Sequence, residues 1–98
     1  MASATAERDG PTLRVSGELN FASVADLWRA TGPLFATDPP LRIDLGGVTH
    51  SNSAGVALLV EWMAQTRRHR RELIFLNVPA QMRAIIQVAD LDAIFSVI

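Results

Sequence analysis

The chain has 98 residues, of which 49% are hydrophobic and 19% are charged, and its formal net charge is −1. This length suits one domain with a single core, and the apolar composition excludes an intrinsically disordered protein and a nucleic-acid binder driven by positive charge. The chain has no cysteine, and all nine basic residues are arginine, which excludes a disulfide scaffold, a thiolate metal site, a cysteine nucleophile and a lysine Schiff base. A small, nearly neutral domain of this kind suggests a protein that works by contacting another protein.

The N-terminal part of the chain predicts a hairpin of two strands. Residues 3–8 form a weak first strand, and Asp9-Gly10 is a strong hairpin turn signal. Leu13 and Val15 then alternate with polar residues, which predicts a half-buried second strand. We expect this second strand to end at Gly17.

A helix and a third strand are expected next. Asn20 or Ser23 can cap the helix, whose apolar residues fall at i, i+3 and i+4: Val24, Leu27 and Trp28. We expect the helix to end at Gly32-Pro33. Residues 41–45 alternate between apolar and polar side chains and form the clearest strand, which we expect Gly46-Gly47 to break.

The second half of the chain predicts two further helices and two strands. A helix over residues 54–70 has an apolar face made by Val56, Leu59, Val60 and Met63, widened by Leu58 and Trp62. A buried strand follows at residues 73–76, and Pro79 suits the first turn of a third helix. One face of that helix is apolar: Met82, Ile85, Ile86 and Ala89. A short strand is expected at residues 94–97.

This order of elements predicts an α/β protein in which helices pack on a small, mixed β-sheet. We expect a single domain over residues 1–98. The run from Leu45 to Val60 has no charged residue, but its first half is polar, so it does not predict a membrane span. No targeting segment is evident, and we expect a cytoplasmic protein.

Ser51, Asn52 and Ser53 stand together where the 54–70 helix begins. Each can accept a hydrogen bond from an unpaired N–H of the first turn, which stabilises a helix by about 1 kcal/mol. A helix N-terminus also tolerates a phosphate, and phosphorylation of Ser53 would add about −1.5 to −2 charges there. Capping and a functional role are therefore compatible at this position.

Three segments of the chain resemble the STAS domain family, and the resemblance covers nearly the whole chain. They are Ser16-Gly17-Glu18-Leu19-Asn20, Leu41-Arg42-Ile43-Asp44-Leu45 and Ser51-Asn52-Ser53-Ala54-Gly55-Val56-Ala57-Leu58-Leu59. The third segment is similar to the Asp-Ser-x-Gly motif of bacterial anti-sigma factor antagonists. Within the family the chain looks more like the MlaB-like branch, the small STAS subunits of Mla phospholipid-transport ABC complexes. That likeness lies in Trp28, in Ala57-Leu58-Leu59 and in Asn77-Val78-Pro79.

The resemblance implies a non-catalytic protein, without a cofactor, that docks on a partner through the start of the second helix. The implied partner is the cytoplasmic ATPase subunit of an Mla-type ABC complex, similar to MlaF, which would place the protein at the periphery of the inner membrane. The implied docking residues are Asn52, Ser53, Ala54, Gly55, Val56, Leu59 and Trp62. Because glycine has no side chain, Gly55 would permit close approach of a partner backbone.

The alternative is an anti-sigma factor antagonist that binds a switch kinase and is inactivated by phosphorylation of Ser53. Here the chain departs from the family pattern, since Asn52 replaces the aspartate before the serine. The loss of this carboxylate favours constitutive docking over regulated phosphorylation.

Other residues allow two interpretations each. The basic residues Arg67, Arg68, Arg70 and Arg71 form a solvated helix end that complements the macrodipole, or they contact an anionic lipid or an acidic partner. Trp28 and Trp62 belong to the core, or they form part of an interface, where tryptophan is enriched. Enzyme signals are weak, because Gly-x-Ser-x-Gly fails at Ser51 and two histidines without cysteine have no metal-ligand spacing.

Overall fold

Strands and helices follow one another in the order that the hydrophobic pattern predicts. A computed structural model describes residues 3–97 of the chain. The elements are β1 (Ala4–Asp9), β2 (Thr12–Leu19), α1 (Phe21–Thr37), β3 (Arg42–Ser51), α2 (Ser53–Arg68), β4 (Ile74–Leu76), α3 (Ala80–Val88), a 3-10 turn (Asp92–Ile94) and β5 (Ser96–Val97). The predicted α/β class and the mixed sheet with helices packed on it are confirmed.

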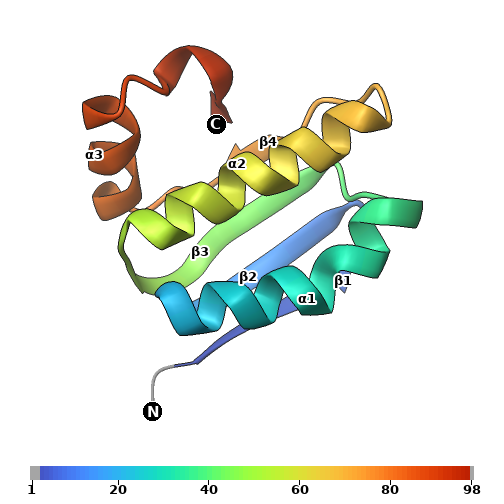
Figure 1. The fold of residues 1–98 in the computed structure, drawn as a ribbon, viewed down its shortest axis with the longest axis horizontal. Coiled ribbons are helices and arrows are strands. Elements are labelled where there is room, and N and C mark those ends of the chain that lie inside the picture. Colours follow the sequence, from blue (N-terminus) through green and yellow to red (C-terminus); the bar gives the residue numbers. More distant parts are fainter. Residues whose placement is uncertain (1–2, 98) are drawn as a thin grey trace.

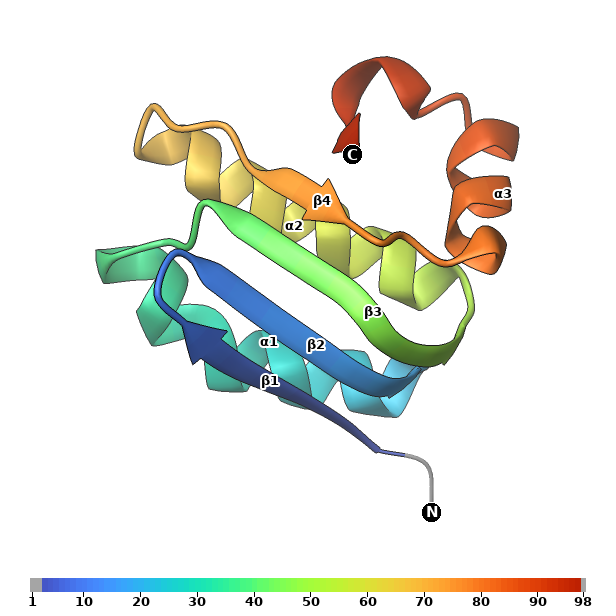
Figure 2. The ribbon, with the colours of Figure 1, turned by 180° about the vertical axis from the view of Figure 1, so that it is seen from behind.

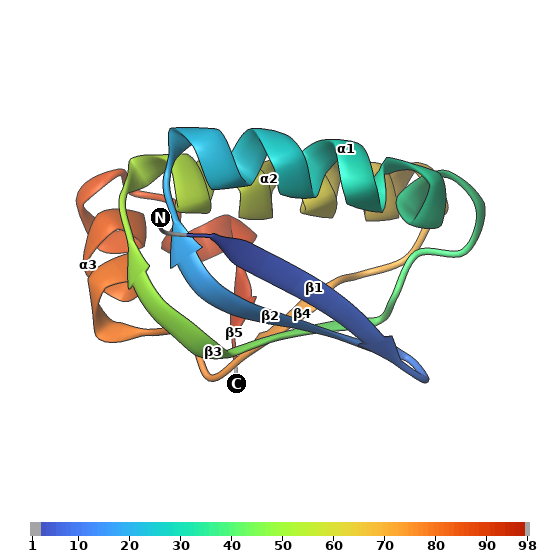
Figure 3. The same cartoon turned by 90° about the horizontal axis from the view of Figure 1, so that it is seen from below.

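The five strands form one sheet in the order β1-β2-β3-β4-β5. The hairpin pair β1 and β2 is antiparallel, whereas every later neighbour is parallel. Helices α1 and α2 lie side by side on one face of the sheet, and α3 lies at the end where α2 begins (Figures 1 and 3). Figure 2 shows the opposite face of the sheet, which no helix covers. The carboxyl ends of β2 and β3 therefore lead directly into the starts of α1 and α2 at one end of the molecule.

The core lies between the sheet and the two long helices. Alternate residues of β2 and β3 point toward the helices and are fully buried, including Leu13, Val15, Ile43 and Leu45. Burial of such side chains contributes about 1.5–3 kcal/mol each. On the helix side, the rings of Phe35 in α1 and Trp62 in α2 stack with their centroids 5.5 Å apart. This contact between the Phe35 and Trp62 rings holds the two helices in a defined relative position.

The expectation that the first helix ends at Gly32-Pro33 is wrong. Helix α1 continues to Thr37 with Pro33 inside it. A proline inside a helix costs about 3 kcal/mol, because it lacks an N–H and crowds the preceding turn. The last turn forms nonetheless, since it carries Phe35 into the core against Trp62. Burial of the Phe35 ring offsets the destabilisation of the helix by Pro33. The sequence around the proline does not predict this contact, because Trp62 is distant along the chain.

The second and third strands also extend beyond the glycines that were expected to end them. Strand β2 passes through Gly17, which has a φ of +99°, and β3 passes through Gly46 and Gly47. Both regions coincide with shifts in the β2–β3 register. A Cβ atom at Gly17 would collide with the carbonyl oxygen of Ser3, and one at Gly47 would collide with the hydroxyl of Ser16. These glycines therefore permit close strand approach at irregular points of the sheet.

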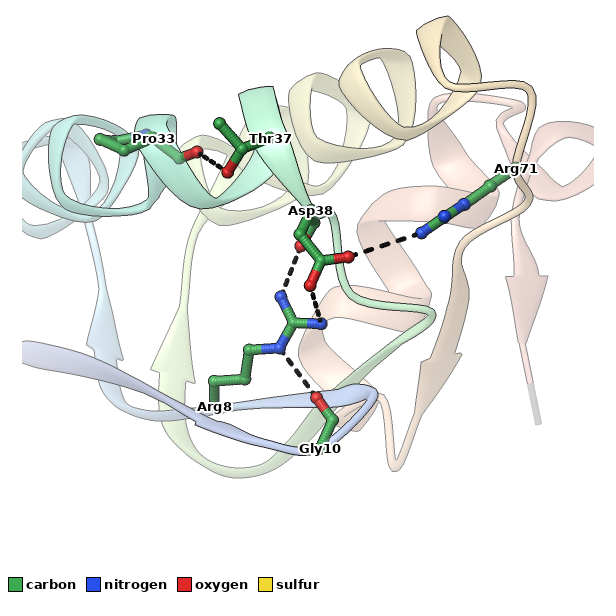
Figure 4. A network of polar contacts seen from close by, with 6 residues as sticks. All are labelled: Arg8, Gly10, Pro33, Thr37, Asp38 and Arg71. Atoms are coloured by element: carbon green, nitrogen blue, oxygen red, sulfur yellow. Dashed lines mark hydrogen bonds and ion pairs between the residues drawn. The ribbon is translucent and has the colours of Figure 1, made fainter.

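A network of polar contacts ties three segments together at the end of the molecule where α2 finishes (Figure 4). The guanidinium of Arg8 in β1 donates to the carbonyl oxygens of Gly10 and Asp38 and pairs with the Asp38 carboxylate at 3.4 Å. Arg71 approaches the same carboxylate at 3.8 Å. Because Asp38 is largely exposed, each of these ion pairs contributes at most about 1 kcal/mol to the free energy of unfolding.

Candidate functional site

The start of α2 presents a hydroxyl group that has no hydrogen-bond partner in the part of the chain that the structure describes. Asn52 is the N-cap, and its side-chain oxygen accepts a hydrogen bond of 2.8 Å from the N–H of Ala54. Ser53 is the first residue of the helix and is exposed. Among residues 3–97, no hydrogen bond involves the Ser53 hydroxyl. Capping is thus assigned to Asn52, and Ser53 is left facing solvent.

The segment before Ser53 is held by hydrogen bonds to two neighbouring elements. The N–H of Asn52 donates to the carbonyl oxygen of Leu19 at the end of β2, at 3.2 Å. The N–H of the buried Ser51 donates to Oε1 of Gln81 in α3, at 3.1 Å, and its hydroxyl donates to the Asn52 carbonyl. Hydrogen bonds to β2 and α3 therefore hold the backbone from which the Ser53 side chain projects.

The electrostatics of this helix end suit a negatively charged or polar contact. Asn52 caps one N–H of the first turn of α2, but this turn carries no acidic side chain, so no charge compensates the helix dipole there. A hydroxyl at this position sits in a field that favours negative charge by about 0.3–1 kcal/mol. The site can therefore serve as a hydrogen-bonding contact or carry a phosphate group.

Five of the seven docking residues expected from the sequence lie inside the molecule, and this corrects that assignment. The buried residues are Ala54, Gly55, Val56, Leu59 and Trp62. Trp62 and Leu59 have no exposed surface at all. Their side chains face the sheet and α1, because these neighbours supply the apolar surface that the helix must cover. Of the expected set, only Asn52 and Ser53 reach the surface.

Gly55 has a different role from the one expected. A Cβ atom there would collide with the hydroxyl of Ser51 and would lie 3.1 Å from Cβ of Leu19. The missing side chain lets α2 approach the ends of β2 and β3. Gly55 therefore serves internal packing rather than the approach of a partner backbone.

A surface cleft between α1 and α2 was missed by the sequence analysis. It has a volume of about 450 Å³ and is lined by Phe21, Val24, Ala25, Trp28, Ala57, Leu58 and Glu61. Phe21 is 76% exposed, which is unusual for an aromatic side chain of a small domain. The signal in the sequence was the seven-residue spacing of Phe21 and Trp28, which puts both rings on one side of a helix. Trp28 is accordingly half-buried at the surface, whereas Trp62 belongs to the core.

The arginine-rich segment lies at the opposite end of α2. The helix has 16 residues and is therefore about 24 Å long, which separates this segment from Ser53. The helix ends in a Schellman motif, in which the N–H groups of Arg70 and Arg71 donate to the carbonyls of Arg67 and Thr66. Arg70 has a φ of +59° and occupies the position where glycine is most common. The segment thus terminates the helix, and its contact with an anionic partner stays a prediction.

No helix within residues 3–97 combines the length and apolar character that crossing a membrane requires. In the same part of the chain, no three histidine or carboxylate side chains gather as a metal site.

Comparisons with known proteins identify a family and two groups of similar structures. The sequence profile described as MlaB, STAS domain, matches residues 2–97. One chain of the Acinetobacter MlaFEDB complex in an ATP-bound conformation is 30% identical, with a TM-score of 0.82 over 96% of this chain and 99% of that chain. A sequence comparison with curated proteins finds no match.

The second group consists of anti-sigma factor antagonists, whose likeness lies in the fold. An anti-sigma factor antagonist from Mycobacterium paratuberculosis is 22% identical, with a TM-score of 0.73 over 99% of this chain and 85% of that chain. The phosphorylated form of the Bacillus cell fate determinant SpoIIAA is 19% identical, with a TM-score of 0.71 over 97% of this chain and 90% of that chain.

Proposed function

Because this chain belongs to the STAS domain family, we propose that it is a non-catalytic subunit that docks on the ATPase subunit of an Mla-type phospholipid-transport ABC complex. Asn52 and Ser53 at the start of α2 form the centre of the contact. The ATPase subunit is cytoplasmic in this proposal, and the chain reaches the inner membrane only through it.

The observation that carries the proposal is the exposed Ser53 hydroxyl, which is unused within the described chain and follows a segment whose backbone is hydrogen-bonded to β2 and α3. A segment whose backbone is ordered before binding loses less conformational entropy when the complex forms. The likeness to a chain of an MlaFEDB complex, 30% identical over nearly the full length of both, supports an ABC partner. Docking would stabilise the ATPase by mass action, since a ligand that binds only the folded state raises its stability.

A second candidate is an anti-sigma factor antagonist that binds a kinase and is released when Ser53 is phosphorylated. The position of Ser53 favours it, because an exposed hydroxyl at the first residue of a helix is accessible to a kinase and a phosphate is tolerated there. The fold likeness to SpoIIAA in its phosphorylated form supports the same idea. Against it, Asn52 caps the helix at the position where antagonists of this family carry aspartate.

Co-purification with the Mla-type ATPase subunit from the same genome tests the first candidate. We expect the wild-type chain to be retained, Ser53→Ala to be retained with weaker binding because it lacks the hydroxyl, and Ser53→Arg to be lost because the long side chain prevents close contact. Thr37→Arg is the matched control, since Thr37 is an exposed hydroxyl residue at the other end of the helix pair. A wild-type chain that fails to bind the ATPase contradicts the proposal.

Intact mass spectrometry tests the second candidate. The chain is incubated with ATP and an anti-sigma factor kinase from the same genome. A stoichiometric mass gain of one phosphate that Ser53→Ala abolishes would establish the antagonist instead, and an unchanged mass would exclude phosphorylation by that kinase.

A further inference from the structure

The C-terminal end of α2 and the loop after it form a positively charged surface, which we name the basic end. It is defined by the exposed side chains of Arg67, Arg68, Arg70 and Arg71. We propose that the basic end binds an acidic peptide segment of a partner protein through the carboxylates of that segment. This contact goes beyond the proposed ATPase docking, because the basic end and Ser53 lie at opposite ends of α2 and the two surfaces do not overlap.

Charge is distributed unevenly between the basic end and the rest of the chain. Residues 67–72 contain four arginines and one glutamate, which gives this segment a net charge of +3. The remaining residues contain five arginines and nine aspartates and glutamates, which gives them a net charge of −4. A negatively charged ligand is therefore attracted to one end of the molecule and disfavoured by the remainder, and this asymmetry orients its approach.

Three arginines of the basic end have guanidinium donors available for a ligand. Among residues 3–97, no ion pair involves Arg68 or Arg70. Arg71 approaches Oδ1 of Asp38 only at 3.8 Å, which is longer than a hydrogen bond, so its donors can still bind another acceptor. A ligand can thus bind these three side chains without displacing a hydrogen bond that the described fold requires.

The carboxylate of Asp38 shows which chemical group fits between the arginines at this end of the molecule. It lies between the guanidiniums of Arg8 and Arg71, which approach it from two different segments (Figure 4). Guanidinium groups suit carboxylates because their planar donors can form two parallel hydrogen bonds to the two oxygens. Since Asp38 is 70% exposed, a carboxylate from a ligand can reach the same position and compete with it for Arg71.

The arrangement of these groups favours a peptide over a membrane surface as the ligand. Arg8 and Arg71 converge on one carboxylate, whereas a layer of lipid headgroups would require cations spread over a plane (Figure 4). Stable membrane binding by a basic surface also requires apolar insertion or a lipid anchor. The large apolar side chain that the described residues expose at this end is Leu41, and it is only 42% exposed.

Fluorescence anisotropy of a labelled hexaglutamate peptide, titrated with the full chain at low ionic strength, tests the proposal. We expect saturable binding that weakens as salt is added, because salt screens exposed charges, and no binding to a hexaglutamine peptide. The double variant Arg68→Gln with Arg70→Gln should weaken binding about tenfold, since each exposed ion pair contributes at most about fivefold. Arg29→Gln with Arg83→Gln is the matched control, because it changes the net charge equally at exposed positions on α1 and α3. We expect this control to bind within twofold of the wild type.

A change at Asp38 should act in the opposite direction. Asp38→Asn removes the carboxylate that competes for Arg71, so we expect it to tighten binding of hexaglutamate about two- to threefold. Asp90→Asn is the control, since it removes an exposed carboxylate at the end of α3 and should leave binding unchanged. Melting temperatures close to that of the wild type verify that all variants fold. Equal tightening by Asp38→Asn and Asp90→Asn would show that net charge, and not the basic end, governs binding, and it would overturn the proposal.

Two other anionic ligands test the assignment to a peptide. Vesicles of phosphatidylcholine and phosphatidylglycerol in equal parts are assayed by flotation, and a single-stranded DNA hexamer is assayed by the same titration. If either ligand binds at least as tightly as hexaglutamate, or if the two double variants weaken binding equally, the acidic-peptide site is overturned. Because none of these measurements includes the ATPase subunit, their failure leaves the proposed docking through Ser53 standing.

Discussion

The indole N–H of Trp62 donates a hydrogen bond of 3.0 Å to the hydroxyl of Thr31, and both side chains are buried between α1 and α2. The Thr31 hydroxyl in turn donates to the carbonyl oxygen of Leu27 at 2.7 Å. Within residues 3–97 the indole N–H makes no other hydrogen bond, so Thr31 supplies the acceptor that burial of Trp62 requires. Together with the stacked ring of Phe35, the bond sets the spacing of the helices and hence the width of the cleft above them.

Replacing Thr31 by valine keeps the shape of the side chain and leaves the indole N–H without an acceptor. We expect Thr31→Val to lower the free energy of unfolding by about 1–3 kcal/mol, the cost of a buried unsatisfied donor. Urea unfolding monitored by tryptophan fluorescence measures it. Thr37→Val is the control, since the Thr37 hydroxyl also bonds a helix carbonyl but is exposed, and a change below about 0.5 kcal/mol is expected there. If Thr31→Val and Thr37→Val lowered the free energy of unfolding equally, loss of the hydrogen bond to the indole would not explain the effect of Thr31→Val.

Two glycines in the helices are expected to respond to alanine in opposite directions. In Gly55→Ala the added methyl collides with the hydroxyl of Ser51. We expect the free energy of unfolding to fall by about 1–3 kcal/mol. In Gly32→Ala the added methyl has no atom within 4 Å. We expect the free energy of unfolding to rise by about 0.5–1 kcal/mol, because alanine has a higher helix propensity than glycine. Thermal unfolding compares the two. The double variant Gly55→Ala with Ser51→Ala should recover part of the loss, and no recovery would implicate Leu19 as the limiting contact.

The carboxylate of Asp44 should make stability depend on pH. Its pKa lies below the ordinary value of 3.8, because the side chain of Asn77 and the N–H of Gly46 donate to the ionised form. A lowered pKa contributes stability above the unfolded value, and that contribution is lost as the pH falls through the folded value. We expect Asp44→Asn to flatten the decline in melting temperature below about pH 4. Asp92→Asn removes an exposed carboxylate elsewhere and should leave the decline unchanged. An identical acid profile for Asp44→Asn and the wild type would contradict the assignment.

A negative charge at position 53 should separate folding from docking. Ser53→Asp places a carboxylate at the first residue of α2, where the helix dipole stabilises it by about 0.3–1 kcal/mol. We therefore expect an unchanged or slightly raised melting temperature together with weaker binding to the ATPase subunit, because a desolvated charge enters the contact. Calorimetric titration and thermal unfolding of the same preparation measure both. Weaker binding accompanied by a lowered melting temperature would point to misfolding instead of a blocked contact.

The predictions from the sequence are correct where residues close together in the chain determine the structure. The alternation around Leu13 and Ile43 and the helical spacing around Leu59 identified the buried faces, which the structure confirms. Asn20 caps α1 with a complete capping box, as one of the two expected candidates. Local rules fail at Pro33, where the contact of Phe35 with the distant Trp62 outweighs the helix-breaking effect of the proline.

The sequence by itself determined the order of the elements, the STAS family and the position of Ser53 at the start of a helix, because periodicity, caps and motif spacing act over a few residues. Only the tertiary structure decided which residues of α2 are exposed and which are buried. Leu59 and Trp62 turned inward and Ala57 and Glu61 outward, since the sheet and α1 cover one side of the helix. The cleft with Phe21 likewise exists only because two segments far apart in the sequence pack side by side. Packing between distant segments depends on the whole fold, and no local pattern encodes it.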